Sequence, residues 1–266
     1  MIRALMSTSH KATVQKQFTK TADAFTEFAV RDGPEVLSEK LEFVKPQHAD
    51  LSLDVACGPG AFVLALAPRV RFARGLDLTE ELLRRARQLQ LERNILNVSF
   101  DRGEAERLPY PDGVFDLVTC QCSLHHMPKP PMALREMVRV TKPEGRLAVI
   151  DALSPESDSK FELHNLIETT RDPSHTLSLK LTTFLEMFES LGLEITRQLL
   201  KRRQRSFKQW MLRAGLEPRH KRYKETRKLL EESIPGDRAG YSARVQDDDI
   251  SIVHHEGMFL LVGGRL

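Results

Sequence analysis

The sequence predicts an α/β protein built on a doubly wound, mostly parallel sheet, and three observations predict it. Short apolar runs alternate with amphipathic segments through the first 150 residues, as expected for successive right-handed βαβ units. The run 115–120 is apolar at nearly every position, which is typical of a strand buried on both faces. Residues 53–60 form an apolar run that ends in a small-residue loop just before a helix.

The predicted elements follow the chain in a regular order. The sequence predicts strands over residues 51–56, 72–78, 98–100, 115–120, 147–150, 193–200 and 258–262, the last two antiparallel at one edge of a seven-stranded sheet. It predicts helices over 62–67, 80–91, 132–140 and 183–191, and one or two more over 12–31. Residues 206–250 form a basic helical insertion before the last strand, and its end is acidic.

The length of 266 residues suits one large α/β domain. We therefore expect a single domain over 1–266, divided into an N-terminal helical lid (1–45), a ligand-binding core (46–155) and a C-terminal part (156–266). Ligands of open parallel sheets bind beyond the carboxyl ends of the strands. The leading helix and the insertion are the segments available to cover that edge.

Composition excludes several classes of protein. No apolar run approaches ~18 residues, so no membrane span is expected, and the first twenty residues lack a signal-peptide pattern. The cysteines are Cys57, Cys120 and Cys122; the last two are two apart on one strand, a poor arrangement for a disulfide or a metal. The histidines show no metal-binding spacing. These features predict reduced thiols, no metal and a cytoplasmic protein.

Positive charge is concentrated in one block. The net charge is only +3, yet residues 197–228 contain thirteen Lys or Arg and two acids. Such a block could meet nucleic acid, an anionic membrane surface or an acidic substrate. It could equally be the solvated face of helices in the insertion.

The loop after the first strand predicts a nucleoside-cofactor site. Gly58 and Gly60 follow Ala56, and Val63 stands where a dinucleotide fingerprint would have its third glycine, so NAD is not expected. The loop also lacks the Lys-Ser/Thr of a phosphate-binding loop. Asp77 ends the next strand, at the distance where a carboxylate accepts hydrogen bonds from ribose hydroxyls.

The ordered set of segments resembles the class I S-adenosylmethionine-dependent methyltransferases, in the branch similar to the ubiquinone/menaquinone C-methyltransferases. The segments that carry the resemblance are 53–60, 75–77, 103–109, 115–118 with 124–126, and 141–145. The resemblance covers about 14–155 well and the last third loosely. Glu104 stands where the family has an aspartate, and Glu144 replaces a turn glycine.

This resemblance implies a Rossmann-like fold and S-adenosyl-L-methionine as cofactor. The cofactor contacts that it implies are Asp54, Ala56, Gly58, Gly60, Asp77, Leu78, Gly103, Glu104, Ala105 and Gln121. Residues 171–175 resemble a segment near the acceptor pocket of small-molecule members. If the acceptor must lose a proton, the candidate bases are His126 and His175, followed by His125 and Asp151.

The sequence therefore favours methylation of carbon or oxygen in a small, fairly apolar molecule, enclosed by Phe18, Phe25 and the segment around Trp210. Two alternatives stay open. The first is an RNA methyltransferase that uses the 197–228 block, although the block contains few aromatic residues for base stacking. The second is an S-adenosylmethionine-binding protein that catalyses a reaction other than methyl transfer.

Overall fold

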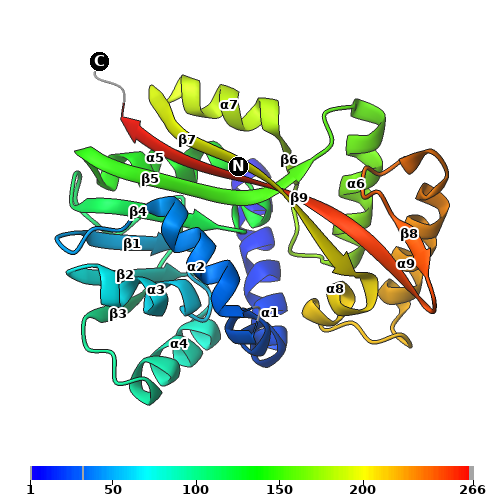
Figure 1. The fold of residues 1–266 in the computed structure, drawn as a ribbon, viewed down its shortest axis with the longest axis horizontal. Helices are drawn as coiled ribbons and strands as arrows, with labels where there is room; N and C mark the ends of the chain where they lie inside the picture. The colour runs from blue at the N-terminus through cyan, green and yellow to red at the C-terminus, as the bar shows by residue number, and fades with distance from the viewer. Residues whose placement is uncertain (1, 32, 264–266) are drawn as a thin grey trace.

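The computed structural model describes residues 2–31 and 33–263 and confirms the predicted fold class (Figure 1). Within these residues the sheet has the order β3-β2-β1-β4-β5-β9-β7, with two short strands added at β5 and β9. The strands are β1 (Leu51–Val55), β2 (Phe72–Asp77), β3 (Val98–Arg102), β4 (Phe115–Gln121), β5 (Thr141–Ser154), β6 (Leu179–Lys180), β7 (Leu193–Ser206), β8 (Arg244–Gln246) and β9 (Asp249–Gly263). The first five are parallel, and β9 pairs antiparallel with both β5 and β7.

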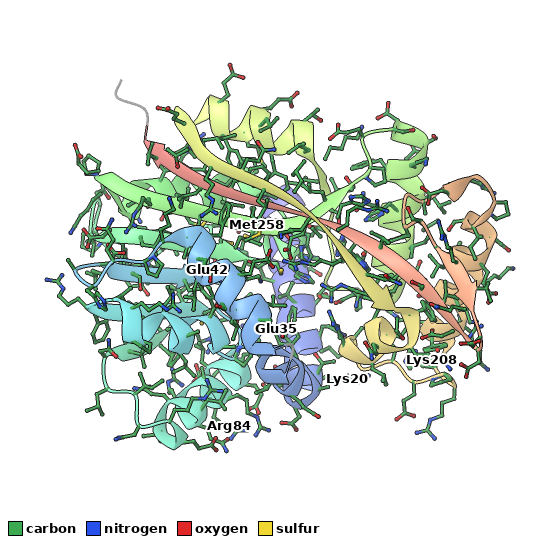
Figure 2. The ribbon with its side chains drawn as sticks, in the orientation of Figure 1. Lys20, Glu35, Glu42, Arg84, Lys208 and Met258 are labelled. Atoms are coloured by element: carbon green, nitrogen blue, oxygen red, sulfur yellow. The ribbon has the colours of Figure 1, made fainter. Side chains whose placement is uncertain are left out.

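Helices cover both faces of the sheet. They are α1 (Ile2–Arg31), α2 (Gly33–Val44), α3 (Ala61–Leu66), α4 (Glu80–Glu92), α5 (Pro130–Val140), α6 (Asp158–Arg171), α7 (Leu181–Ser190), α8 (Phe207–Arg213) and α9 (Lys221–Ser233), with short 3-10 turns at Ala67–Arg69, Leu124–His126 and Pro235–Asp237. On one face, Leu134 of α5 and Phe184 of α7 belong to one buried cluster. On the other, α2, α3 and α4 enclose a second cluster that includes Val63 and Met258, the latter fully buried in β9 (Figure 2). The core therefore lies on both sides of the sheet, as a doubly wound fold requires.

The antiparallel strands β7 and β9 are longer than the sequence predicted. They stay paired from Leu193 opposite Gly263 to Ser206 opposite Ser251, well past the last pair between β5 and β9. The sequence did not predict this extension, because the Lys and Arg residues of β7 interrupt the apolar alternation that indicates a strand. Arg203 is held there by Glu256 at 2.9 Å and by Glu39 of α2 at 2.7 Å.

This extension supports a separate lobe, on the right in Figure 1, made of α6, α8, α9 and β8. Phe207, Trp210, Tyr241 and Ile252 belong to its buried cluster. Lys208 at the start of α8 pairs with Asp248 next to β9 and lies at the outer side of the lobe (Figure 2). The helical insertion predicted before the last strand is confirmed, with β8 added to it.

The N-terminal helix α1 runs between the sheet and this lobe (Figure 1). The amide of Gln15 donates to the carbonyl of Leu78 beyond β2 at 3.1 Å, and Gln17 donates to the carbonyl of Ala214 after α8 at 3.2 Å. One helix therefore joins the two halves of the molecule across the carboxyl edge of the parallel strands. Among the described helices, none has an apolar stretch long enough to span a bilayer.

Candidate active site

A cavity of about 750 Å³ opens at the carboxyl edge of the parallel strands. Its walls come from the loops after β1, β2 and β3 on one side and from the exit of β4 in the middle. The other side is formed by α6, α8 and the outer ends of β7 and β9, and α1 covers it. The cavity therefore joins a cofactor side to an acceptor side under one helix.

The glycine loop has one face toward the cavity and one toward the core. Gly58 has a φ of 54° and lines the cavity, and a Cβ there would lie 3.3 Å from the ring of Phe25 on α1. Gly60 has a φ of 75°, but a Cβ there would lie 2.7 Å from Phe100 and 2.9 Å from Ala86. Gly60 is therefore required for close packing against Phe100 and Ala86 inside the protein. It does not line the cavity, so its contact with the cofactor stays a prediction.

The carboxylate of Asp77 shapes the same loop. One oxygen accepts a hydrogen bond from the backbone N–H of Gly58 at 2.8 Å, and the other accepts from the N–H of Thr79 at 2.8 Å. Burial raises the pKa of Asp77, and these backbone hydrogen bonds oppose the rise. An ionised carboxylate has further lone pairs. Asp77 can therefore hold the loop and still accept hydroxyl donors from the cavity, which it lines.

Asp54 lies at the end of β1 with its side chain buried. The hydroxyl of Thr119 on β4 donates to it at 2.5 Å. Burial raises the pKa of Asp54 to about 7, against the opposing effect of the Thr119 hydrogen bond. The side-chain amide of Gln121 on the same wall also opposes this rise, although its buried nitrogen has no partner of good hydrogen-bond geometry among the described residues. This corner combines a carboxylate that can become ionised with an amide donor.

The loop after β3 is fixed to its surroundings. The N–H of Gly103 donates to the carbonyl of Asp77 at 3.0 Å, while Glu104 and Glu106 pair with Lys11 of α1 at 2.9 and 2.5 Å. Glu104 and Ala105 line the cavity. Apart from Gly60, the structure brings together every residue predicted to contact the cofactor: Asp54, Ala56, Gly58, Asp77, Leu78, Gly103, Glu104, Ala105 and Gln121.

His125 forms a dyad with Asp151. The Nδ1–H of His125 donates to Asp151 Oδ1 at 2.5 Å, and the N–H of Ala152 donates to the same oxygen at 2.7 Å. The Asp151 side chain is only 2% exposed, while His125 is 13% exposed and lines the cavity. Burial lowers the pKa of His125, but the Asp151 carboxylate outweighs burial and the net pKa is raised. The Nε2 lone pair is left as the basic atom.

The two histidines that the sequence favoured as bases lie beside this dyad. His126 donates from Nδ1 to the carbonyl of Ser174 at 2.9 Å, and its ring centroid lies 5.1 Å from that of Phe18. Burial, together with nearby His125, lowers the pKa of His126 to about 4. His175 stacks on His125 with centroids 5.0 Å apart, and burial holds its pKa well below the usual value. Both remain neutral near pH 7.

The outer wall of the cavity contains polar residues that sequence reasoning missed. Glu168 of α6 approaches Arg171 at 3.3 Å and accepts from the hydroxyl of Tyr241 at 3.1 Å. The guanidinium of Arg171 lies 4.7 Å from the ring centre of Trp210, which also lines the cavity. Arg171 is the first residue of the segment 171–175, which the sequence analysis had placed near the acceptor pocket by resemblance. No sequence motif indicated Glu168 or His254, because they lie on α6 and β9, outside the segments that resemble the family.

The 197–228 block does not form one open basic surface. Part of it lies on β7, where Lys201 and Arg203 pair with Glu39 of α2. Another part lies on α9, where Arg227 pairs with Glu231 at 2.8 Å. Arg202, Arg203, Arg205 and Arg213 line the cavity. The block is thus divided between ion-paired helix faces and the inner wall. Within the described residues, no cluster of three or more His, Cys, Asp or Glu could hold a metal ion.

Comparisons with known proteins identify the family. A family model described as a methyltransferase domain matches residues 53–149. The uncharacterized methyltransferase YcgJ of Bacillus subtilis is 33% identical over 178 residues, or 67% of this chain and 70% of that protein. The YcgJ crystal structure has a TM-score of 0.80 at 26% identity, covering 88% of this chain and all of that one. The chain belongs to the class I S-adenosylmethionine-dependent methyltransferases.

Two further relatives are similar to this methyltransferase in fold or in part of the sequence. A putative methyltransferase from Bacillus halodurans has a TM-score of 0.81 at 26% identity, covering 87% of this chain and 100% of that one. A demethylmenaquinone methyltransferase of Listeria monocytogenes is 36% identical over 120 residues, 44% of this chain. The match spans about half (51%) of that enzyme. The methyl donor is S-adenosylmethionine, as the sequence motifs implied.

The cavity of this methyltransferase fits that donor on two observations. Gly58 leaves free space between the loop and Phe25 that a side chain would fill. The Gln121 amide and the Asp54 carboxylate lie at one corner of the cavity, and the amino acid end of the donor offers a carboxylate for the first and an amine for the second. Asp77 would hold the ribose, and the Glu104–Ala105 segment would hold the adenine.

Proposed function

We propose that this methyltransferase methylates an oxygen or an activated carbon of a small molecule, and that His125 removes the proton from the acceptor. One observation carries the proposal: the His125–Asp151 dyad lies on the wall of the cavity that contains the cofactor loop. A base in this position would serve an acceptor that ionises as it is methylated.

The chemistry sets the tasks of the protein. S-adenosylmethionine, when bound, supplies an electrophilic methyl group on a positively charged sulfur. The chain must hold the acceptor in line with that methyl group and exclude water. Lys11, Gln15 and His10 of α1 each bond to a different part of the cavity rim. These contacts support a closed site around a small acceptor.

The dyad is suited to general-base catalysis. Asp151 accepts the Nδ1–H, which fixes the tautomer and leaves Nε2 facing outward to take a proton, and the carboxylate stabilises the imidazolium that forms. His126 and His175 were the bases expected from sequence. Their low pKa values make them poorer bases at neutral pH, and we assign them to orienting the acceptor.

The enclosed site argues against an RNA substrate. Single-stranded RNA needs an open groove with phosphate contacts and stacking aromatics. Here Phe18 and Phe25 of α1 cover the part of the cavity next to the cofactor, and their ring centroids are 5.3 Å apart. An apolar, flat part of a small acceptor would fit against these rings.

The test is product mass after incubation with labelled S-adenosylmethionine and a panel of quinols, phenols and polyketides. The wild type is expected to methylate at least one member, and His125→Asn to lose most of that activity while binding S-adenosylhomocysteine normally. His48→Asn, at an exposed histidine outside the cavity, is the matched control. Full activity in His125→Asn would overturn the assignment of the base.

A further inference from the structure

We infer that the acceptor carries an oxyanion group, such as a carboxylate, that binds at the outer wall of the cavity between Arg171 and Arg205. This inference rests on the proposed function and names the class of acceptor. We call the four residues Arg171, Arg205, Trp210 and His254 the arginine wall. They come from α6, β7, α8 and β9, and all line the cavity.

The first support is the charge of the lining. Away from the cofactor loops, the described lining residues on the acceptor side include five basic side chains (Arg171, Arg202, Arg203, Arg205, Arg213) and three acidic ones (Glu168, Asp172, Glu256). Each acid already has partners: Glu168 is close to Arg171, Glu256 pairs with Arg203, and Asp172 accepts from Ser174. Positive charge therefore remains in excess on this side.

Arg205 contributes to this excess of positive charge. Among the described residues, Arg205 forms no ion pair, although its side chain is only partly exposed. A cationic side chain held at a cavity wall without a counter-charge favours an anionic ligand. A guanidinium can bind a carboxylate through two parallel hydrogen bonds. Arg205 is thus the side chain that the ligand would neutralise.

The strand register places Arg205 with the other members of the wall. Arg203 lies opposite His254, and Arg205 is two residues further along β7, so the three side chains share one face of the β7–β9 ribbon. His254 is 5.1 Å from Trp210 between ring centroids. Arg171 reaches the same ring from α6 with its guanidinium 4.7 Å from the centre, and its side chain is 12% exposed.

The second, independent support is a set of unused polar atoms. The Nδ1 atoms of His254 and His175 make no hydrogen bond within the described part of the chain, whereas Nε2 of His254 lies 3.4 Å from Oε1 of Glu168. His175 is only 5% exposed, and both rings line the cavity. Buried polar atoms in native proteins normally have partners. The Nε2 of His175 lies 3.3 Å from the hydroxyl of Ser178, which can donate to it, so Nδ1 can carry the proton. An oxyanion on the acceptor would accept a hydrogen bond from this Nδ1–H and from the two guanidinium groups.

The position of His175 connects this wall to the chemistry. Its ring stacks on that of His125, so the oxyanion seat and the base are neighbours along one wall. An acceptor bound at the arginine wall would have its charge fixed at one end and its ionisable atom presented to His125. Two contacts of this kind would orient a small molecule for in-line transfer.

The experiment uses Trp210, which is the only tryptophan in the sequence and belongs to the wall. The full chain, saturated with S-adenosylhomocysteine, is titrated with benzoate and, separately, with the neutral isostere benzamide while tryptophan fluorescence is followed. We expect a saturable change with benzoate and at least tenfold weaker binding of benzamide. Benzamide binding as tightly as benzoate would overturn the inference.

Two variants make the test specific. Arg205→Gln and Arg171→Gln are each expected to weaken benzoate binding at least tenfold, with unchanged affinity for S-adenosylhomocysteine by calorimetry. Arg219→Gln is the matched control, because that side chain is 87% exposed and lies outside the cavity. Arg205 is the decisive position, since it leaves the packing on Trp210 intact. Wild-type benzoate affinity in Arg205→Gln would overturn the inference.

The outcome also separates this inference from the proposed function. If the chain binds S-adenosylhomocysteine and methylates neutral phenols as well as their carboxylated analogues, the proposed function stands and the oxyanion seat fails. If benzoate binds at the wall but no acceptor of any charge is methylated, the seat stands and the proposed function fails.

Discussion

Replacing Asp151 with asparagine tests the proposed base most directly. The carboxylate receives the Nδ1–H of His125 at 2.5 Å and is 2% exposed, so little solvent screens it. A net hydrogen bond to a charged group contributes about 1.5–3 kcal/mol. Losing it when the imidazolium forms should lower kcat/KM by about 10- to 200-fold, since each 1.36 kcal/mol is a factor of ten.

The pH profile provides the second readout. His125 acts as a base only when neutral, so kcat/KM of the wild type should fall as pH drops through its raised pKa, above 6.5. The groups that face it are Asp151, His126, His175, Glu168 and Arg171. In Asp151→Asn the pKa loses the carboxylate that raises it, while burial still lowers it. The decline should therefore move to lower pH.

The assay is initial rate against pH from 5 to 9, with cofactor-product affinity measured at each pH. His126→Asn is expected to lower the rate without moving the pH at which it declines, because His126 has a pKa of about 4 and does not titrate in the physiological range. If His126 were the base, the wild-type rate would be flat from pH 5.5 upward. A flat wild-type profile, or an Asp151→Asn variant with the rate and profile of the wild type, would refute the dyad.

The remaining predictions concern the cofactor side. Gly58→Ala should weaken S-adenosylhomocysteine binding in a folded protein, whereas Gly60→Val should lower the melting temperature, because its Cβ would lie 2.7 Å from Phe100; calorimetry and thermal melts distinguish the two. Asp77→Ala should weaken binding by at least one charged hydrogen bond, about 1.5–3 kcal/mol, and wild-type affinity by calorimetry would exclude it from the ribose site. Asp54 has a pKa of about 7 in the free protein, so binding an amine beside it should release a proton below that pH, and affinity should fall as pH drops, by up to about tenfold per unit. Calorimetry in buffers of different ionisation enthalpy counts that proton, and equal heats in all buffers at pH 6 would contradict the prediction.

The cofactor side was predictable from sequence because its residues follow parallel strands. The ends of β1, β2, β3 and β4 meet at one edge whatever the details of packing, so Asp54, Asp77 and Gln121 had to converge. Gly60 shows the limit of that reasoning. Both glycines of the loop have positive φ, and only the three-dimensional packing shows that Gly58 faces α1 while Gly60 faces Phe100.

The base was harder to assign from sequence. His125 and His126 are neighbours in a 3-10 turn at the exit of β4, so a pattern cannot decide which of them meets a carboxylate. The partner is Asp151 on β5, and the pairing of β4 with β5 brings the two together. Asp151 appeared in the sequence only as a weaker candidate base, because its role depends on this pairing.

The arginine wall lay beyond sequence reasoning for a physical reason. In residues 201–206, charged side chains replace the apolar alternation of a strand. The sequence therefore could not predict the pairing of β7 with β9 that places Arg205 near His254. From sequence, residues 197–228 were only a concentration of positive charge that could meet nucleic acid, an anionic membrane surface or an acidic substrate. The fold divides it: Lys201 and Arg203 pair with Glu39, Arg227 pairs with Glu231 and Lys208 pairs with Asp248, whereas Arg205 on the cavity wall has no ion pair among the described residues. Part of the charge that could have met a polymer on the surface thereby lies on the wall of the cavity.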